Sequence, residues 1–398
     1  MVDFAQRMSD MSKTAKVVRG LFNSMTNPEV ISFSGGAPAN ESLPIERLRE
    51  ISNDVFTRES RGVEAFQYCN PSGLRELREI IAKRILGNQN INASADDVLI
   101  LGGGLEAMNL VCQVFINPGD VILVESPTFV QSLEIFEMFQ AKCVAVDMDE
   151  NGIIPEDLEK KIKQYNPKMI YVIPTFQNPT GKTLSKERRE WLADIGSRKN
   201  IMILEDDPYQ DLRYDGEKLL PIKAYDKTGN TILANSFSKN FSPGARLGYV
   251  YADHKIIEKI FDAKTATNSH TNAIAQVLCS EFIKRGYFEE NIKKTCKIYK
   301  ERRDIIIQCI DKYLPKGTKR VVPDGGIFTW VELPDNIDTT ELLKEAEQYK
   351  VAFLPGEGFF ADGKGKGKNC MRIGFGNIQP EKIEQGIKRL GELIASRL

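Results

Sequence analysis

Short apolar runs alternate with amphipathic segments through the middle of the chain. The runs are rich in valine and isoleucine and nearly continuous in apolar character, which indicates strands buried on both faces of a parallel sheet. Segments of helical periodicity lie between them, such as the one that places Leu105, Met108 and Cys112 on one face. The pattern predicts strands over residues 98–101, 121–125, 142–146, 169–173, 201–205, 231–234 and 247–251. This alternation predicts an α/β fold.

The pattern changes after about residue 285. One apolar stripe predicts a single long helix over residues 288–314, followed by short strands over 319–322, 327–332, 351–354 and 370–374 and a helix from Pro380. A chain of 398 residues is too long for one core, since single cores stop growing near ~250–300 residues. We therefore expect a large domain over residues 46–284 and a smaller α+β domain over residues 285–398, to which the N-terminal segment 1–45 also belongs.

Composition excludes several classes of function. Lysine and arginine number 54 against 55 acidic residues, so the chain lacks the overall basic charge typical of nucleic-acid binding. The seven cysteines show no C-x-x-C spacing, which argues against a disulfide framework or a zinc site. The N-terminus has no apolar signal segment, and no run approaches the ~18 apolar residues of a membrane span. We expect a cytoplasmic protein without metal, nucleic-acid or membrane partners.

A glycine-rich run, G-G-G-L-E-A at residues 102–107, follows a predicted strand and opens a predicted helix. It matches the G-x-G-x-x-A pattern of dinucleotide sites. The physical argument is narrower, because backbone N–H groups at a helix N-terminus bind any suitable anion. The run therefore predicts a phosphate site without choosing the cofactor. A second run, G-K-G-K-G-K at residues 363–368, has no helix after it and is interpreted as a solvated turn.

Polar motifs follow three consecutive predicted strands. N-P-T-G at 178–181, E-D-D-P-Y at 205–209 and N-S-F-S-K at 235–239 each stand at a strand's carboxyl end, and R-L-G-Y at 246–249 enters the next strand. Ligands of α/β sheets bind outside the carboxyl ends of the strands. We expect these side chains to form one site.

The motifs, in this order and separation, resemble the fold-type-I pyridoxal-phosphate-dependent aminotransferases of class I/II, and the resemblance covers essentially the whole chain. The segments S-F-S-G-G-A-P at 32–38 and M-R-I-G-F at 371–375 are most similar to the 2-aminoadipate and kynurenine aminotransferase branch. The resemblance implies a large domain with a mostly parallel seven-stranded sheet between helices and a smaller α+β domain built from both termini. It also implies pyridoxal 5'-phosphate as cofactor and a homodimer with shared active sites.

The resemblance assigns catalytic and ring-binding roles to five residues. Lys239 forms the Schiff base with the cofactor, and its freed amine then carries the proton as general acid and base. Asp206 keeps the pyridine nitrogen protonated. Tyr209 and Asn178 hydrogen-bond the phenolic oxygen, and Phe129 stacks on the ring.

The same resemblance implies how phosphate and substrate are bound. The phosphate ligands are Ser236, Ser238, Arg246, the backbone N–H groups of Gly104 and Leu105, and Tyr68 from the neighbouring subunit. Many relatives carry Ser and Gln where this chain has Gly104 and Leu105, so only backbone donors remain there. Arg372 binds the substrate α-carboxylate with its planar fork, together with Asn178 and Gly36. Arg19, on a helix expected over residues 12–22, faces the substrate side chain.

The expected reaction is transfer of an amino group from an L-α-amino acid (2-aminoadipate, aromatic or aliphatic) to a 2-oxo acid such as 2-oxoglutarate. The first alternative is another reaction of amino acids on the same cofactor, by a β-lyase or a decarboxylase. A second is an effector-binding module of a transcriptional regulator, although the winged-helix segment of such regulators is not seen in this sequence. A nicotinamide dehydrogenase is the third, on the strength of the glycine run alone.

Overall fold

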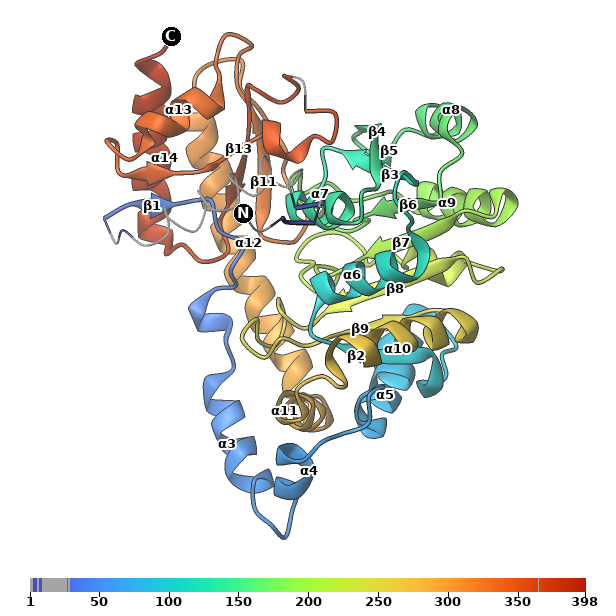
Figure 1. Ribbon diagram of the computed structural model, residues 1–398. Coiled ribbons are helices and arrows are strands. Elements are labelled where there is room, and N and C mark those ends of the chain that lie inside the picture. The colour runs from blue at the N-terminus through green and yellow to red at the C-terminus, as the bar shows by residue number, and fades with distance from the viewer. Residues whose placement is uncertain (1–2, 6, 9–26, 28, 364) are drawn as a thin grey trace.

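The computed structural model describes residues 3–5, 7–8, 27, 29–363 and 365–398 (Figure 1). The expected helix over 12–22 and Arg19 lie outside these residues. An eight-stranded sheet with the order β2-β9-β8-β7-β6-β3-β4-β5 forms the centre of one half of the molecule. Its strands are β2 (Val98–Leu101), β3 (Val121–Ser126), β4 (Lys142–Asp149), β5 (Gly152–Ile153), β6 (Met169–Val172), β7 (Met202–Asp206), β8 (Thr231–Ser236) and β9 (Gly248–Tyr251).

The sheet is mostly parallel, as predicted. β3, β4, β6, β7 and β8 run parallel, whereas β9 is antiparallel to both β2 and β8. All seven predicted strands are present. The prediction omitted β5, a two-residue strand antiparallel to the end of β4, which is too short to leave a periodic signal in the sequence.

Helices cover both faces of this sheet (Figure 1). One face packs on α6 (Gly104–Phe115), α7 (Val130–Met138) and α10 (His254–Asn268). The other face packs on α5 (Arg75–Ile80) and α11 (Ala273–Lys284) at one end and on α8 (Pro155–Tyr165) and α9 (Lys186–Lys199) at the other. β2 and β6 are buried at every residue, which explains their continuous apolar sequence.

The second half of the molecule has its own sheets. A four-stranded antiparallel sheet has the order β10-β11-β14-β13, with β10 (Lys319–Arg320), β11 (Phe328–Glu332), β14 (Cys370–Gly374) and β13 (Leu354–Pro355). β1 (Ile31–Ser32) pairs in parallel with β12 (Val351–Ala352). The single strand predicted over 351–354 is thus divided between two sheets. A large apolar cluster joins these strands to α12 (Tyr287–Tyr313), α13 (Thr339–Ala346) and α14 (Pro380–Ala395).

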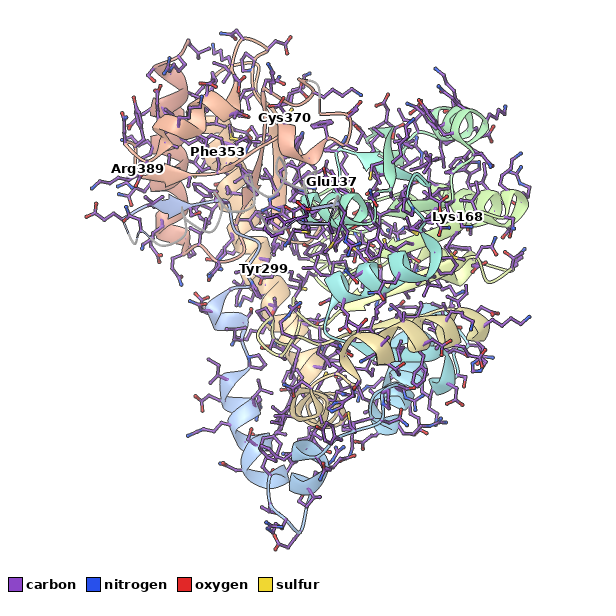
Figure 2. The ribbon with its side chains drawn as sticks, in the orientation of Figure 1. Glu137, Lys168, Tyr299, Phe353, Cys370 and Arg389 are labelled. Carbon is purple, nitrogen blue, oxygen red and sulfur yellow. The ribbon has the colours of Figure 1, made fainter. Side chains whose placement is uncertain are left out.

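The long helix α12 anchors the N-terminal segment. Tyr299, labelled in Figure 2, is fully buried on α12, and its hydroxyl accepts a hydrogen bond from the backbone N–H of Ala39 at 3.0 Å. The remaining helical segments are α3 (Ile45–Val55), α4 (Gly62–Phe66), a π-helical turn (Ile81–Leu86) and 3-10 turns (Asn40–Ser42, Gly87–Gln89, Ala95–Asp97, Ile222–Tyr225, Glu357–Phe359). None of the helices in the described ranges has the length and apolar character that a membrane crossing requires.

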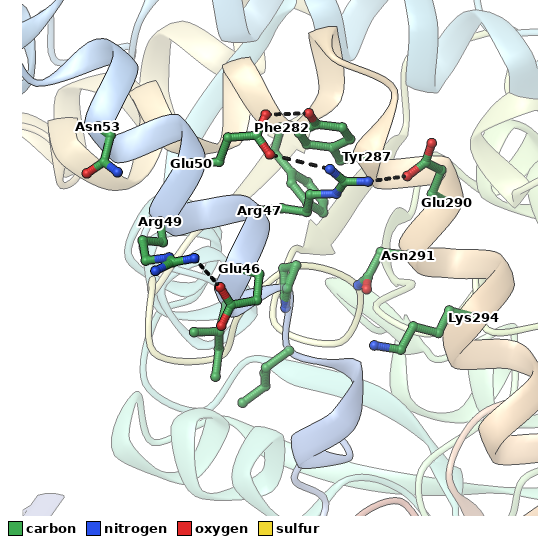
Figure 3. A pocket seen from close by; sticks show the side chains of 13 residues that line it. Glu46, Arg47, Arg49, Glu50, Asn53, Phe282, Tyr287, Glu290, Asn291 and Lys294 are labelled. Carbon is green, nitrogen blue, oxygen red and sulfur yellow. Dashed lines mark hydrogen bonds and ion pairs between the residues drawn. The ribbon is translucent and has the colours of Figure 1, made fainter.

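A cavity of about 760 Å³ lies between α3 and the start of α12 (Figure 3). Arg47 crosses it, with ion pairs to Glu50 and Glu290 and its guanidinium 4.2 Å from the centre of the Tyr287 ring. The cavity is lined by residues of segments 43–53 and 282–294, which include none of the predicted site residues.

Candidate active site

The carboxyl ends of three neighbouring strands bring the central residues together. β6, β7 and β8 are adjacent and parallel, so their carboxyl ends lie at the same edge of the sheet. Asn178 lies in the loop after β6, Asp206 ends β7 and Lys239 follows β8. Asn178 and Asp206 are buried. The edge formed by these strand ends is where α/β sheets bind ligands.

The amine of Lys239 is held by a backbone carbonyl of the N-terminal segment. Its Nζ donates a hydrogen bond to the backbone carbonyl of Gly36 at 2.7 Å. Burial lowers the pKa of Lys239 to about 8, and the positive charges of Arg372 and Arg246 act in the same direction. A substantial fraction of this lysine is therefore a neutral, nucleophilic amine near pH 8.

The carboxyl group of Asp206 is held at the end of β7. Its Oδ2 accepts a hydrogen bond from the hydroxyl of Tyr171 at 2.9 Å. Burial raises the pKa of Asp206 to about 7; the hydrogen bond from Tyr171 opposes this shift, whereas the charge of Asp207 adds to it. A Cβ atom built on Gly104 would lie 3.7 Å from Oδ1 of Asp206. The second carboxylate oxygen therefore faces the N-terminus of α6.

The glycine run forms an anion site at the start of α6. Gly103 precedes the helix with a φ of +106°, a conformation that favours glycine. A Cβ atom on Gly103 would lie 3.0 Å from Nη2 of Arg246, so the guanidinium lies against the helix N-terminus. The Gly103 position offers no side chain to cap this helix end. Free N–H groups beside an arginine fit a phosphate.

Two hydroxyl groups stand beside this anion site. Ser236 and Ser238 are buried, and the Ser236 hydroxyl donates to Oγ of Ser238 at 2.9 Å. Ser236 is paired with Gly248 on β9, and Gly248 packs so closely on Gly103 that a Cβ atom would come within 2.9 Å of the Gly103 Cα. The hydrogen-bond donors at the start of α6 fit a phosphate group, and Lys239 fits a group that reacts with an amine. Asp206 fits a ring nitrogen, so the three together fit a cofactor that carries all of these groups.

Arg372 connects the two halves of the molecule inside the site. From β14, its Nη1 donates to Oδ1 of Asn178 at 2.8 Å and its Nη2 donates to the carbonyl of Ser34 at 2.6 Å. The guanidinium lies 4.2 Å from the centre of the Phe328 ring. Burial lowers the pKa of Arg372 to about 10, and the Tyr209 hydroxyl opposes the shift. Its Nε is buried and has no partner among the described residues, which suits a carboxylate ligand.

Tyr209 and Gly36 complete the surroundings of Arg372. Tyr209 is buried edge-on to Phe328, with ring centres 5.9 Å apart. Burial raises the pKa of its hydroxyl, and a side-chain hydrogen bond with Asn178 opposes that shift. A Cβ atom on Gly36 would lie 2.8 Å from the Phe328 ring, so segment 34–36 passes directly over it. The sequence analysis did not identify Phe328, which looked like an ordinary strand residue.

The contacts described so far do not include three further predicted residues, Phe129, Leu105 and Tyr68. Phe129 is half-buried at the start of α7, and Leu105 is half-buried on α6. The Tyr68 side chain is 85% exposed, edge-on to His270 with ring centres 5.6 Å apart, and no hydrogen bond within the described ranges joins it to the other predicted residues. Arg19 lies outside the residues that the structure describes. The sequence analysis also missed Tyr171, whose only signal was a tyrosine in an otherwise aliphatic strand.

Comparisons with known proteins agree with this geometry. The family model for aminotransferase class I and II matches residues 28–390. The chain is 36% identical over 404 residues to the aromatic-amino-acid aminotransferase 1 of Thermococcus litoralis, a match that covers 100% of this chain and 96% of that protein.

Two solved structures are also similar. One is the kynurenine aminotransferase of Pyrococcus horikoshii in complex with PMP and with KYN and KYA as substrates and products, with a TM-score of 0.94, 36% identity and coverage of 99% and 97% of the two chains. The other is the α-aminoadipate aminotransferase of Thermus thermophilus, complexed with N-(5'-phosphopyridoxyl)-L-leucine, with a TM-score of 0.90, 29% identity and coverage of 99% and 97%.

Proposed function

The chain belongs to the class I and II aminotransferase family, and we propose that it moves the amino group of an L-α-amino acid onto a 2-oxo acid at the site formed by Lys239, Asp206 and Arg372. The enzyme depends on pyridoxal 5'-phosphate, which when bound supplies an electron sink for the carbanion at the substrate Cα. The observation that carries the assignment of the site is the amine of Lys239, held 2.7 Å from the Gly36 carbonyl with its pKa lowered to about 8.

Lys239 has two tasks in this account. Its neutral amine would hold the cofactor covalently, because only the unprotonated form is a nucleophile. The same amine, when free, would move the proton between the substrate Cα and C4′ of the cofactor as general acid and base. The positive charges of Arg372 and Arg246 favour the neutral amine that both tasks require.

The other residues hold and orient the cofactor. Asp206 would keep the ring nitrogen protonated through Oδ1, because Tyr171 donates to Oδ2. Asn178 and Tyr209 would hydrogen-bond the phenolic oxygen, and Phe129 would cover the ring. The phosphate is bound by Ser236, Ser238, Arg246, the N–H groups of Gly104 and Leu105, and Tyr68 of a second subunit.

Arg372 orients the substrate. The contacts with Asn178 and Ser34 fix the two Nη atoms, and the guanidinium lies over the Phe328 ring. The orientation of the edge that carries the unpartnered Nε is therefore fixed. That edge binds the α-carboxylate of the donor amino acid and then of the acceptor. Gly36 allows segment 34–36 to lie close enough to complete the substrate site.

The donors that we propose are aromatic amino acids and 2-aminoadipate, with aliphatic amino acids as further donors. Support comes from the similar proteins, which are named for aromatic amino acids, kynurenine and α-aminoadipate. Arg19 is the proposed partner of an acidic side chain. The proposed acceptor is 2-oxoglutarate, whose α-carboxylate Arg372 would bind in the same way.

The protein is proposed to work as a homodimer in the cytoplasm. Val63, Phe66 and Tyr68 lie in one short stretch and expose 57%, 68% and 85% of their surface, which suits an interface with a second copy. The seven cysteines are free thiols, which suits a reducing compartment. The two sets of sheets support a large domain over 46–284 and a small one from 1–45 and 285–398, with the site between them.

The test is a half-reaction on the purified holoenzyme. A panel of donors, including phenylalanine, kynurenine, 2-aminoadipate and leucine, is added without acceptor, and the visible spectrum of the cofactor is followed. An aminotransferase converts the cofactor to the pyridoxamine form and releases the matching 2-oxo acid, and 2-oxoglutarate then restores the original spectrum. Release of carbon dioxide or of a substrate side chain, without formation of the pyridoxamine form, would instead identify a decarboxylase or a β-lyase.

A further inference from the structure

Tyr171 lies next to the site but is not one of the proposed ligands of the cofactor or the substrate. It is fully buried in β6, and its hydroxyl donates to Oδ2 of Asp206 at 2.9 Å. In the parallel pairing of β6 with β7, Tyr171 stands opposite Leu204. Asp206 is two residues further along β7, so its side chain points to the same face of the sheet as that of Tyr171. This register gives Tyr171 a direct path to the carboxylate.

The Tyr171 ring is fixed by its own neighbours. It lies edge-on to Phe136 of α7, with ring centres 5.2 Å apart and planes at 76°. Ser132, one turn earlier on α7, is fully buried and lies next to Tyr171. The Ser132 hydroxyl donates to the carbonyl of Phe129 at 2.5 Å. The Tyr171 ring is therefore held against α7, with its hydroxyl directed at the carboxylate at the end of β7.

We propose that Tyr171 is the positioning residue for Asp206: its hydroxyl occupies Oδ2, so that Oδ1 is turned toward the ring nitrogen of the cofactor. The proposal rests on the proposed function, because it concerns how the cofactor ring is held.

The charges around Asp206 explain why a neutral donor matters there. The groups that face it are Glu125 from β3, Asp207 after β7, Tyr209 in the same loop and Tyr171 from β6. No lysine or arginine of the described residues forms an ion pair with Asp206, and Tyr171 is the side chain that donates a hydrogen bond to it. A buried carboxylate with acidic neighbours is easily protonated, and a hydrogen bond to its charged form opposes that.

Removing the hydroxyl should therefore weaken the hold on the protonated ring. In the Tyr171→Phe variant, Asp206 loses a hydrogen bond to its ionised form, so its pKa rises. One hydrogen bond to a charged group corresponds to about ten-fold or more in an equilibrium constant. Affinity for the cofactor falls as pH decreases through the pKa of Asp206, so this fall should move to higher pH by about one unit in the variant.

The experiment compares the wild type with two variants. Tyr171→Phe removes the donor to Asp206. Tyr249→Phe is the matched control, because Tyr249 is another buried strand tyrosine and its hydroxyl has no partner among the described residues. Affinity for pyridoxal 5'-phosphate is measured by equilibrium dialysis over a range of pH, with kcat, KM and thermal unfolding of the apoenzyme alongside.

We expect Tyr171→Phe to bind the cofactor about ten-fold more weakly, to shift the pH profile upward and to lower kcat more than it raises KM. Tyr249→Phe should leave the affinity and the profile unchanged. An affinity and pH profile of Tyr171→Phe equal to those of Tyr249→Phe would overturn the inference. So would a loss of affinity that merely follows the loss of apoenzyme stability. A wild type that binds no cofactor would instead refute the proposed function itself.

Discussion

The guanidinium of Arg372 donates to the side-chain oxygen of Asn178 at 2.8 Å, across 194 residues of sequence. Arg372 belongs to β14 of the four-stranded sheet, and Asn178 follows β6 of the eight-stranded sheet. The bond therefore places the proposed ligand of the substrate carboxylate beside a proposed ligand of the cofactor. Substrate and cofactor sites are fixed relative to each other by this contact.

Replacing Arg372 with lysine should impair every donor. Lysine keeps the charge but cannot bind Asn178, Ser34 and a carboxylate in one plane. Loss of a charge-assisted hydrogen bond costs about 1.5–3 kcal/mol, so kcat/KM should fall roughly ten- to a hundred-fold. Arg320→Lys is the matched control, because Arg320 makes a two-pronged contact with Asp311 at the surface. Steady-state kinetics that show equal effects of the two substitutions would contradict the assignment.

Replacing Asp206 with asparagine should lower kcat by several orders of magnitude while some cofactor still binds. The amide keeps the shape but cannot stabilise a positive charge on the ring nitrogen. Asp207→Asn is the control, since it neutralises the adjacent buried carboxyl, whose pKa burial also raises. Single-turnover rates with a saturating donor make the comparison. Near-normal rates in Asp206→Asn would contradict the proposal that Asp206 keeps the ring nitrogen protonated.

Replacing Arg19 with glutamine should affect acidic donors selectively. A desolvated pair between arginine and the distal carboxylate of 2-aminoadipate is worth about 1.5–3 kcal/mol, or roughly ten- to a hundred-fold in kcat/KM. Leucine and phenylalanine have no such carboxylate and should react as before. The same change for all donors, or no change for any, would leave Arg19 as a surface arginine.

The chain should sediment as a dimer at micromolar concentration. Obligate interfaces of this kind usually bury about 2,000 Å² or more and are apolar. Phe66→Asp puts a charge in the exposed stretch beside Tyr68 and should produce monomers with weakened cofactor binding. Val322→Asp is the control, because Val322 is also exposed but lies in the other half of the molecule. A fully active monomer of the wild type would refute the shared site.

The sequence predicted the strands that have continuous apolar sequences and the polar motifs that follow them. The seven longer strands were visible because double-sided burial makes their sequences continuously apolar, and the motifs with Asn178, Asp206 and Lys239 stood at the ends of three of them. Parallel pairing then brings those residues together without further information.

Contacts between distant segments were not predictable in this way. Tyr171 looked like one more core residue of its strand, and only the register of β6 with β7 shows that it faces Asp206. The division of 351–354 between two sheets depends on the partners β1 and β14, which local periodicity does not encode. The exposed position of Tyr68 likewise has its proposed explanation in a second copy of the chain.

The most direct measurement of the central claim is reduction of the holoenzyme with borohydride, followed by peptide mapping. The account predicts that the cofactor becomes permanently attached to the peptide that contains Lys239. Lys239→Ala should show neither this label nor measurable turnover. Lys264 provides the control, since it is a buried lysine whose pKa is likewise lowered by burial, and Lys264→Ala should keep the label on Lys239. Label on Lys264 or on any lysine other than Lys239 would contradict the account.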